Sequence, residues 1–367
     1  MVETKVRAGG LYATAFAGAV VSAAAISPHL FGSSGYKEAL LSVAVSLAVT
    51  SMAAVPALCL QKERVGLLEA ARLHLGRFAR VVEGFYFAVL AYFGFYFLAH
   101  FLIFMENTLN PATPLWLTGG CIVLTAAYGA LRGLPTLCRA GTIAFVPMLL
   151  GFCFIFIALL KDIDTAYLLQ KKPLQPVPGA MALFTAGRMT SLVHLLVFLP
   201  HTKGRKAAGF WVLNIGFHLV CALVVLFLAL CLGSMAETQL FPVYTLALLA
   251  NVGSLQRLDI LFLVLWVVGA VLRLALDMTA ASMFFQVKDR STLGEAPRYS
   301  PRMGAVLLQA VLCAVPAVWV AGSLSLQKWL LSSQMITYIS LAAGAVVPVF
   351  ILCIERFNRC RKGGRSL

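Results

Sequence analysis

The sequence predicts an all-α membrane protein with ten transmembrane helices. Of its 367 residues, 61% are hydrophobic and 12% are charged, whereas an average soluble domain is about 45 to 50% apolar and about 25% charged. Apolar runs of about 20 residues, the length needed to cross a bilayer, recur along the whole chain. Because a segment in lipid must satisfy its own backbone hydrogen bonds, these runs predict helices.

The ten spans divide the chain without leaving room for a soluble domain, so we expect residues 1–367 to form one transmembrane domain. The N-terminal residues lead into a full-length apolar span without a cleavage site of small residues, which predicts that the first span is retained. The predicted spans are residues 11–31, 37–60, 84–105, 114–132, 139–160, 181–200, 207–233, 257–287, 303–323 and 335–355.

The distribution of basic residues predicts that both termini lie in the cytoplasm, because Lys and Arg are retained on that side. With this orientation the cytoplasmic segments, including the tail 356–367, hold 21 of the 29 Lys and Arg residues, and the opposite side holds six. The net charge of +15 is therefore explained by membrane topology, and binding to nucleic acid is not expected. The partner that the composition implies is the lipid bilayer.

The cytoplasmic loop 61–80 has the pattern of an amphipathic helix, with Val65, Leu68, Ala71 or Arg72, and Leu75 on one side. Such a helix can lie on the inner membrane surface or can be a solvated loop helix, and the sequence favours neither.

The eighth span carries two charges in an apolar run, LWVVGAVLRLALDM at residues 265–278. Each charge costs on the order of 2.5 to 3.5 kcal/mol near the bilayer centre. Spacings of three and four place Trp266, Gly269, Arg273 and Asp277 on one helical face, which should point into the helix bundle. The pair is either a structural ion pair or part of a cavity lining.

The third span carries Tyr92, Tyr96 and His100 at spacings of four, again on one face. This stripe is a second candidate for lining a polar cavity. His194 in the sixth span and His218 in the seventh are weaker candidates, and we expect His218 to serve packing.

No catalytic or cofactor motif is present in the sequence. It has no GxSxG, no phosphate-binding loop, no HExxH and no cluster with metal-ligand spacing. The nine cysteines are scattered singly and are typical of small apolar residues rather than metal ligands. We therefore expect a protein that is not an enzyme and has no metal or cofactor.

Several dispersed motifs resemble one family. Phe241-Pro242, Val252-Gly253, Arg257-Leu-Asp259 and Trp266 follow one another around the start of the eighth span. Upstream lie DTAYLLQKKPLQPVPGA, then Phe198-Leu-Pro200 and Lys203-Gly-Arg205-Lys206, and near the start Pro28 and Gly35-Tyr-Lys-Glu-Ala-Leu. Together they resemble the spore-germination permeases, the B subunits of endospore germinant receptors. Two positions depart from the family pattern, because Ser191 and Gln256 stand where acidic residues are common.

The resemblance implies the fold of the amino acid, polyamine and organocation transporters, with two inverted repeats of five helices, here about 11–160 and 181–355. In such folds helices 1 and 6 are interrupted near the midplane, and their free backbone groups bind the substrate. The corresponding small residues are Gly18 and Ser22 in the first span and Thr190 and Ser191 in the sixth. Small residues of this kind are also common packing contacts.

Two functions are compatible with this resemblance. The first is a germinant-receptor subunit in the spore inner membrane that binds a small nutrient, an amino acid, and signals through the A and C subunits. Backbone groups of spans 1 and 6 would hold the ends of the ligand, and Arg273, His100 and Tyr96 would contact the rest. The second is an autonomous secondary amino-acid transporter coupled to protons or sodium, in which His100 or Asp277 would handle the ion.

Overall fold

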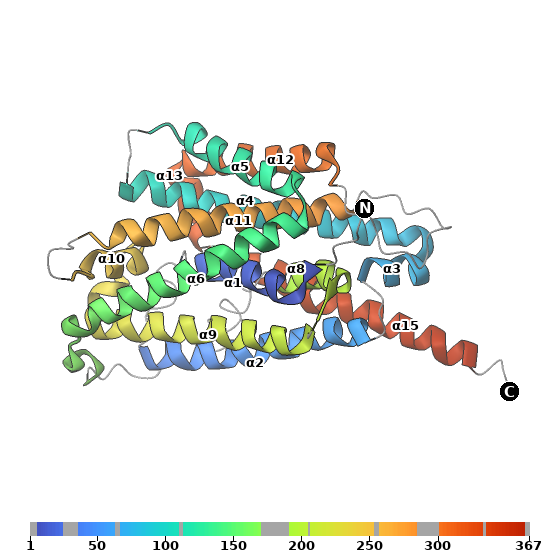
Figure 1. Cartoon of the computed structure of the whole chain (residues 1–367), viewed down its shortest axis with the longest axis horizontal. Helices are drawn as coiled ribbons and strands as arrows, with labels where there is room; N and C mark the ends of the chain where they lie inside the picture. The colour runs from blue at the N-terminus through green and yellow to red at the C-terminus, as the bar shows by residue number, and fades with distance from the viewer. Residues whose placement is uncertain are drawn as a thin grey trace.

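The computed structural model describes residues 6–24, 36–62, 67–109, 113–169, 191–204, 206–252, 257–284, 301–332 and 335–363. Figure 1 shows long helices that lie side by side along one axis. The helices are α1 (Ala8–Ala24), α2 (Tyr36–Lys62), α3 (Leu67–Leu75), α4 (Ala79–Phe104), α5 (Leu115–Leu131), α6 (Leu134–Leu159), α8 (Ser191–Phe198), α9 (Lys206–Cys231), α10 (Pro242–Leu249), α11 (Asp259–Phe284), α12 (Met303–Ala321), α13 (Leu324–Ser332), α14 (Met335–Leu341) and α15 (Val347–Gly363).

The described helices fit a protein that crosses a membrane several times. Seven of them are long and apolar enough to span a bilayer, and α1 and α5 contribute shorter apolar helices. Large apolar side chains are exposed on the outer helices, for example Leu124 (68%), Ile143 (75%) and Trp319 (69%). Exposure of so many apolar side chains to water would be unfavourable, whereas lipid solvates them favourably. The chain is therefore an all-α, multi-pass membrane protein.

Each of the ten ranges predicted from the sequence contains at least one described helix. In the range 181–200, however, only α8 and the short 3₁₀ helix η6 (Leu199–His201) lie within the described residues. The ten-helix count therefore stays a prediction.

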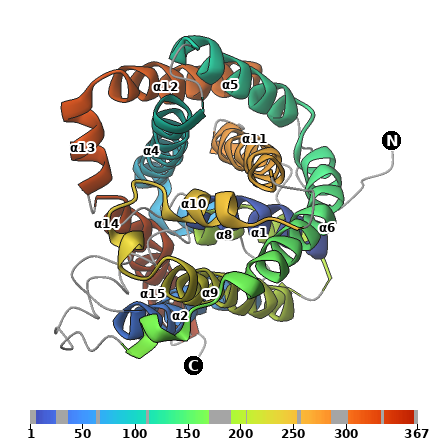
Figure 2. The same ribbon diagram turned by 90° about the vertical axis from the view of Figure 1, so that its left-hand side faces the viewer.

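The helices form a ring of outer elements around inner ones. Seen from one end, α5, α12, α6, α9 and α2 lie around the outside, and α4, α11 and α1 lie within (Figure 2). The inner helix α11 packs against α1, α4, α5, α6 and α12. Every residue from Leu272 to Phe284 is buried, so the second half of α11 is enclosed on all sides.

A two-stranded parallel sheet joins the start of α1 to the segment after α8. Strand β1 (Val6–Arg7) pairs with β2 (Thr202–Lys203), with Val6 opposite Thr202 and Arg7 opposite Lys203. These strands lie at the same end of the molecule as α3 and the C-terminus (Figure 1). The first residues of α1 and the residues that follow α8 are therefore held together.

The amphipathic loop helix is present as α3, and three residues of its predicted apolar side, Leu68, Ala71 and Leu75, pack against the core. It buries Leu67, Ala70 and Ala71 and packs against α15 and α4. Neighbouring helices of the protein therefore cover this face. Val65, which the sequence placed on the apolar side, lies outside the described residues.

Candidate functional site

A buried cluster of charged side chains joins α11 to α8. The Oδ1 atom of Asp277 lies 2.7 Å from Nε2 of His194, and its Oδ2 atom accepts a hydrogen bond of 3.2 Å from Nε of Arg273. The exposed fractions are 2% for Arg273 and 0% for both His194 and Asp277. One carboxylate therefore bridges a cation of its own helix and an imidazole of another.

The surroundings of Arg273 explain how α11 accommodates this charge. A Cβ atom added at Gly18 of α1 would lie only 3.2 Å from Cδ of Arg273, so the α1 backbone packs directly on the arginine stem. On the other side, the guanidinium carbon lies 6.0 Å from the centre of the Phe93 ring of α4. The cation is thus shielded from lipid by two helices and an aromatic face.

The charges of the cluster balance when the imidazole of His194 is neutral. A buried Arg–Asp pair carries no net charge, whereas a protonated imidazole would add an uncompensated positive charge at high cost. The contact with Asp277 requires a hydrogen on Nε2, so the second ring nitrogen, Nδ1, carries a lone pair. No described residue bonds to this Nδ1 atom.

Ser191 lies one helical turn before His194, on the same side of α8. Its hydroxyl is buried and has no hydrogen-bond partner among the described residues. Buried polar groups are normally satisfied. Ser191 Oγ and His194 Nδ1 are therefore two neighbouring polar atoms with capacity to bind a ligand.

Arg273 itself also has unused hydrogen-bonding capacity. Within the described residues it makes one hydrogen bond, through Nε, although a guanidinium carries five N–H groups. Its terminal NH₂ groups form the planar fork that suits a carboxylate. The cluster thus offers donors for an anionic group beside acceptors for a cationic one.

A family comparison connects this cluster to a known group of proteins. A family model described as a spore germination protein matches residues 41–289, more than half of the chain. The chain belongs to this spore germination protein family. The matched segment of the germination protein contains α8 and α11, and so includes His194, Arg273 and Asp277. Among curated proteins, no sequence matches the chain.

Four of the residues that the sequence predicted for this germination protein's site lie at or next to the cluster: Gly18, Ser191, Arg273 and Asp277. The inward orientation of Arg273 and its pairing with Asp277 are confirmed. The role of these residues in binding a ligand stays a prediction.

The remaining predicted residues are Ser22, Thr190, Tyr96 and His100. Helix α1 continues through Gly18 and Ser22 to Ala24, so the expected interruption of span 1 does not lie at those two residues. The side chain of Ser22 and the whole of Thr190 lie outside the described residues.

Tyr96 and His100 are buried in α4, with ring centres 4.2 Å apart. His100 Nδ1 lies 2.9 Å from the Tyr96 carbonyl oxygen. Helix α4 meets Arg273 at Phe93, whereas Phe101 and Phe104 contact Trp266. His100 is seven residues, or about 10 Å, beyond Phe93, at the level of Trp266. His100 therefore does not lie at the level of Asp277, and the role of the Tyr92, Tyr96 and His100 stripe in lining a cavity stays a prediction.

The histidine that does reach Asp277 is His194, which the sequence ranked as a weaker candidate. The available signal was its spacing of three from Ser191, within an apolar span whose one other ionisable residue is Arg188. The other weak candidate, His218, serves packing as expected. Its Nε2 atom lies 2.9 Å from Ser46 Oγ and joins α9 to α2.

The Arg257-Leu-Asp259 motif lies at the start of α11 and holds it in place. Nε and Nη2 of Arg257 donate hydrogen bonds of 3.0 and 3.1 Å to the Asp259 carboxylate. The hydroxyl of Tyr244 in α10 donates a bond of 3.4 Å to the same group. This motif therefore fixes the entry to α11, away from the buried cluster.

Proposed function

We propose that this germination protein is the B subunit of a spore germinant receptor in the spore inner membrane. In this proposal it binds a small nutrient, an amino acid, beside the Asp277 cluster. The observation that carries the proposal is the bridge from α8 to α11 through His194 and Asp277, with ligand capacity left on both helices. Family membership supports the role in germination.

An amino acid matches the polar groups of the cluster. Its carboxylate would bind the terminal NH₂ groups of Arg273, and its ammonium group would donate to Ser191 Oγ and His194 Nδ1. Burial strengthens both interactions because the local dielectric constant is low. The nutrient changes the state of the receptor only if it binds one arrangement of α1, α8 and α11 more tightly than another. The A and C subunits would respond to that shift.

Helix packing supports the proposed architecture of two inverted repeats. Helix α4 packs against α12 and, correspondingly, α11 packs against α5. Each of the pairs α2 and α9, α4 and α11, and α5 and α12 is in contact. A pseudo-two-fold relation that exchanges spans 2, 3 and 4 with 7, 8 and 9 accounts for all these contacts.

The first experiment distinguishes the roles of the two ring nitrogens of His194. It uses spores that lack the native gene and carry a variant copy. Gln in place of His keeps a donor near the Nε2 position, whereas Asn keeps a polar atom near the Nδ1 position. We expect His194→Gln to preserve protein level but to raise the half-maximal amino-acid concentration roughly tenfold or more, because a hydrogen bond to a charged ligand is lost.

The matched control is His218→Gln, which retains the group that faces Ser46 and should leave the nutrient dose-response unchanged. A normal dose-response in His194→Gln spores would exclude a ligand role for Nδ1. His194→Asn should lower protein level, since it removes the donor to Asp277 and leaves the carboxylate with one partner fewer.

The second candidate function is proton-coupled transport of the amino acid, favoured by the buried hydrogen bond between His194 and Asp277. Hydrogen-bonded His and Asp side chains within membrane spans are typical of proton relays. Uptake of labelled amino acids by proteoliposomes decides between the two functions. Accumulation that depends on a pH gradient would identify a transporter, whereas binding without accumulation would support the sensor.

A further inference from the structure

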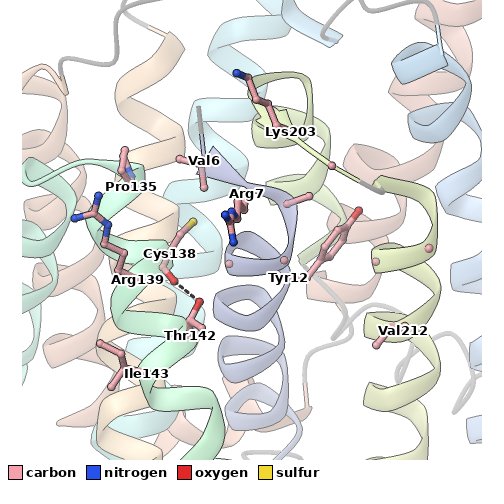
Figure 3. A pocket seen from close by; sticks show the side chains of 16 residues that line it. Val6, Arg7, Tyr12, Pro135, Cys138, Arg139, Thr142, Ile143, Lys203 and Val212 are labelled. Carbon is pink, nitrogen blue, oxygen red and sulfur yellow. Dashed lines mark hydrogen bonds between the residues drawn. The ribbon is translucent and has the colours of Figure 1, made fainter. Parts of the chain in front are cut away.

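A mainly apolar cavity with basic residues at its rim lies at the end of the molecule that holds the two-stranded sheet, away from the Asp277 cluster. An open cavity of about 1130 Å³ is lined by strand β1, the start of α1, the first turns of α6 and α9, and strand β2. Figure 3 shows Arg7 on β1 just before α1, Arg139 on α6 and Lys203 on β2 around this space. No predicted ligand residue lines it.

Among the described residues, the charged side chains that line the cavity are all positive. Arg7, Arg139 and Lys203 line it, and the lining includes no Asp or Glu. All three cations are exposed, and none forms an ion pair with a carboxylate in the described part of the chain. Three cations without counter-charges attract an anionic group.

The rest of the lining is apolar and extends toward the bilayer. Ile143 lies one helical turn beyond Arg139 on α6, about 6 Å deeper along the helix. Val212 lies at a similar depth on α9. Both side chains also face outward, with exposed fractions of 75% and 74%. The cavity therefore combines a basic rim with an apolar wall that continues into the lipid-facing surface.

We infer that this cavity binds an anionic phospholipid of the cytoplasmic leaflet, with its phosphate among Arg7, Arg139 and Lys203 and an acyl chain along Ile143 and Val212. The charge asymmetry of the loops places this end on the cytoplasmic side. Basic pockets between transmembrane helices on that side suit anionic head groups. A soluble anion would use the basic rim but would gain nothing from the apolar wall.

The test measures the thermal unfolding midpoint of the purified full-length protein in mixed micelles as lipid is added. Phosphatidylglycerol should raise the midpoint, and phosphatidylcholine with the same acyl chains should not. The triple variant Arg7→Gln, Arg139→Gln, Lys203→Gln should need about tenfold more phosphatidylglycerol for half the effect. Ala208→Trp, which fills the cavity and keeps its charges, should weaken the response similarly.

The matched control carries Arg77→Gln, Arg80→Gln and Arg302→Gln, which remove the same charge from exposed positions outside the cavity. This control should respond to lipid like the unmodified protein. Equal weakening in both triple variants would overturn the proposal in favour of general surface attraction. A midpoint shift produced by millimolar inorganic phosphate and unaffected by Ala208→Trp would identify a soluble-anion site instead.

Discussion

At the scale of single residues, two Arg–Asp pairs, one at the start of α11 and one within it, have opposite surroundings. The side chain of Arg257 is 68% exposed, so water shares the solvation of its pair with Asp259. The side chain of Arg273 is 3% exposed, and its charge is compensated by Asp277 alone among the described carboxylates. The exposed pair Arg257–Asp259 therefore contributes little to stability. The buried pair Arg273–Asp277 prevents an isolated buried charge.

Removal of the buried carboxylate should destabilise the protein strongly. Asp277→Asn leaves Arg273 as an uncompensated buried cation, which costs about 3 to 5 kcal/mol. The thermal unfolding midpoint in detergent should fall, and a second substitution, Arg273→Met, should restore part of the loss. The control is Arg72→Gln, which breaks a partly exposed pair with Glu83 and should cost about 1 kcal/mol or less. A wild-type midpoint for Asp277→Asn would mean that Arg273 has another counter-charge.

At the scale of helices, close backbone contacts set the positions of α1 and α6. A Cβ atom added at Gly141 of α6 would lie 2.8 Å from the Cα atom of Thr14, which is main chain and cannot rotate away. The hydroxyl of Thr14 donates to the Gly10 carbonyl at 2.8 Å. Small residues permit such close helix contacts in membranes, where lipid supplies no hydrophobic drive for association.

Gly141→Ala should therefore push α1 and α6 apart. We expect overpacking to lower stability by about 1 to 3 kcal/mol, visible as a lower unfolding midpoint. Gly120→Ala is the matched control, since a Cβ there meets no atom within 4 Å. That change should be neutral or stabilising, because alanine favours helix over glycine by up to about 1 kcal/mol. Equal midpoints for the two variants would contradict the close contact.

The sequence predicted which face of a helix is polar more reliably than which helix that face meets. Helical spacing placed Arg273 and Asp277 on an inward face, as found, because periodicity is a local property. It could not identify His194 as the partner, since that contact joins residues 83 positions apart through tertiary packing. The short helices α10 and α13 were missed for a related reason, because helices of eight and nine residues are too short to show a clear apolar period.

At the scale of the whole molecule, the charge asymmetry and the helix arrangement give one orientation. The described basic segments around α3 and β2 lie at one end of the bundle, and α10 and α13 lie at the other (Figure 1). The first end carries the larger share of Lys and Arg, so it should face the cytoplasm, which is the core in a spore.

Cysteine labelling tests this orientation in a background without the nine natural cysteines. Arg77→Cys and Lys328→Cys both introduce exposed thiols, at opposite ends of the bundle. In intact cells that express the protein, a membrane-impermeant maleimide should label the cysteine at 328 and not the one at 77. Permeabilised cells should show labelling of both. The reverse pattern would invert the topology and move the basic cavity to the outer leaflet.

The small sheet has a mechanical consequence for the two helices that flank the Asp277 cluster. Because β1 precedes α1 directly and β2 follows α8 closely, the paired strands act as a pivot at one end of both helices. Helix α1 has 17 residues and acts as a lever about 25 Å long. A tilt of about 5° about that pivot displaces its far end by about 2 Å and its near end hardly at all. A tilt of α1 about the sheet would therefore be felt most at its C-terminal end, inside the bundle.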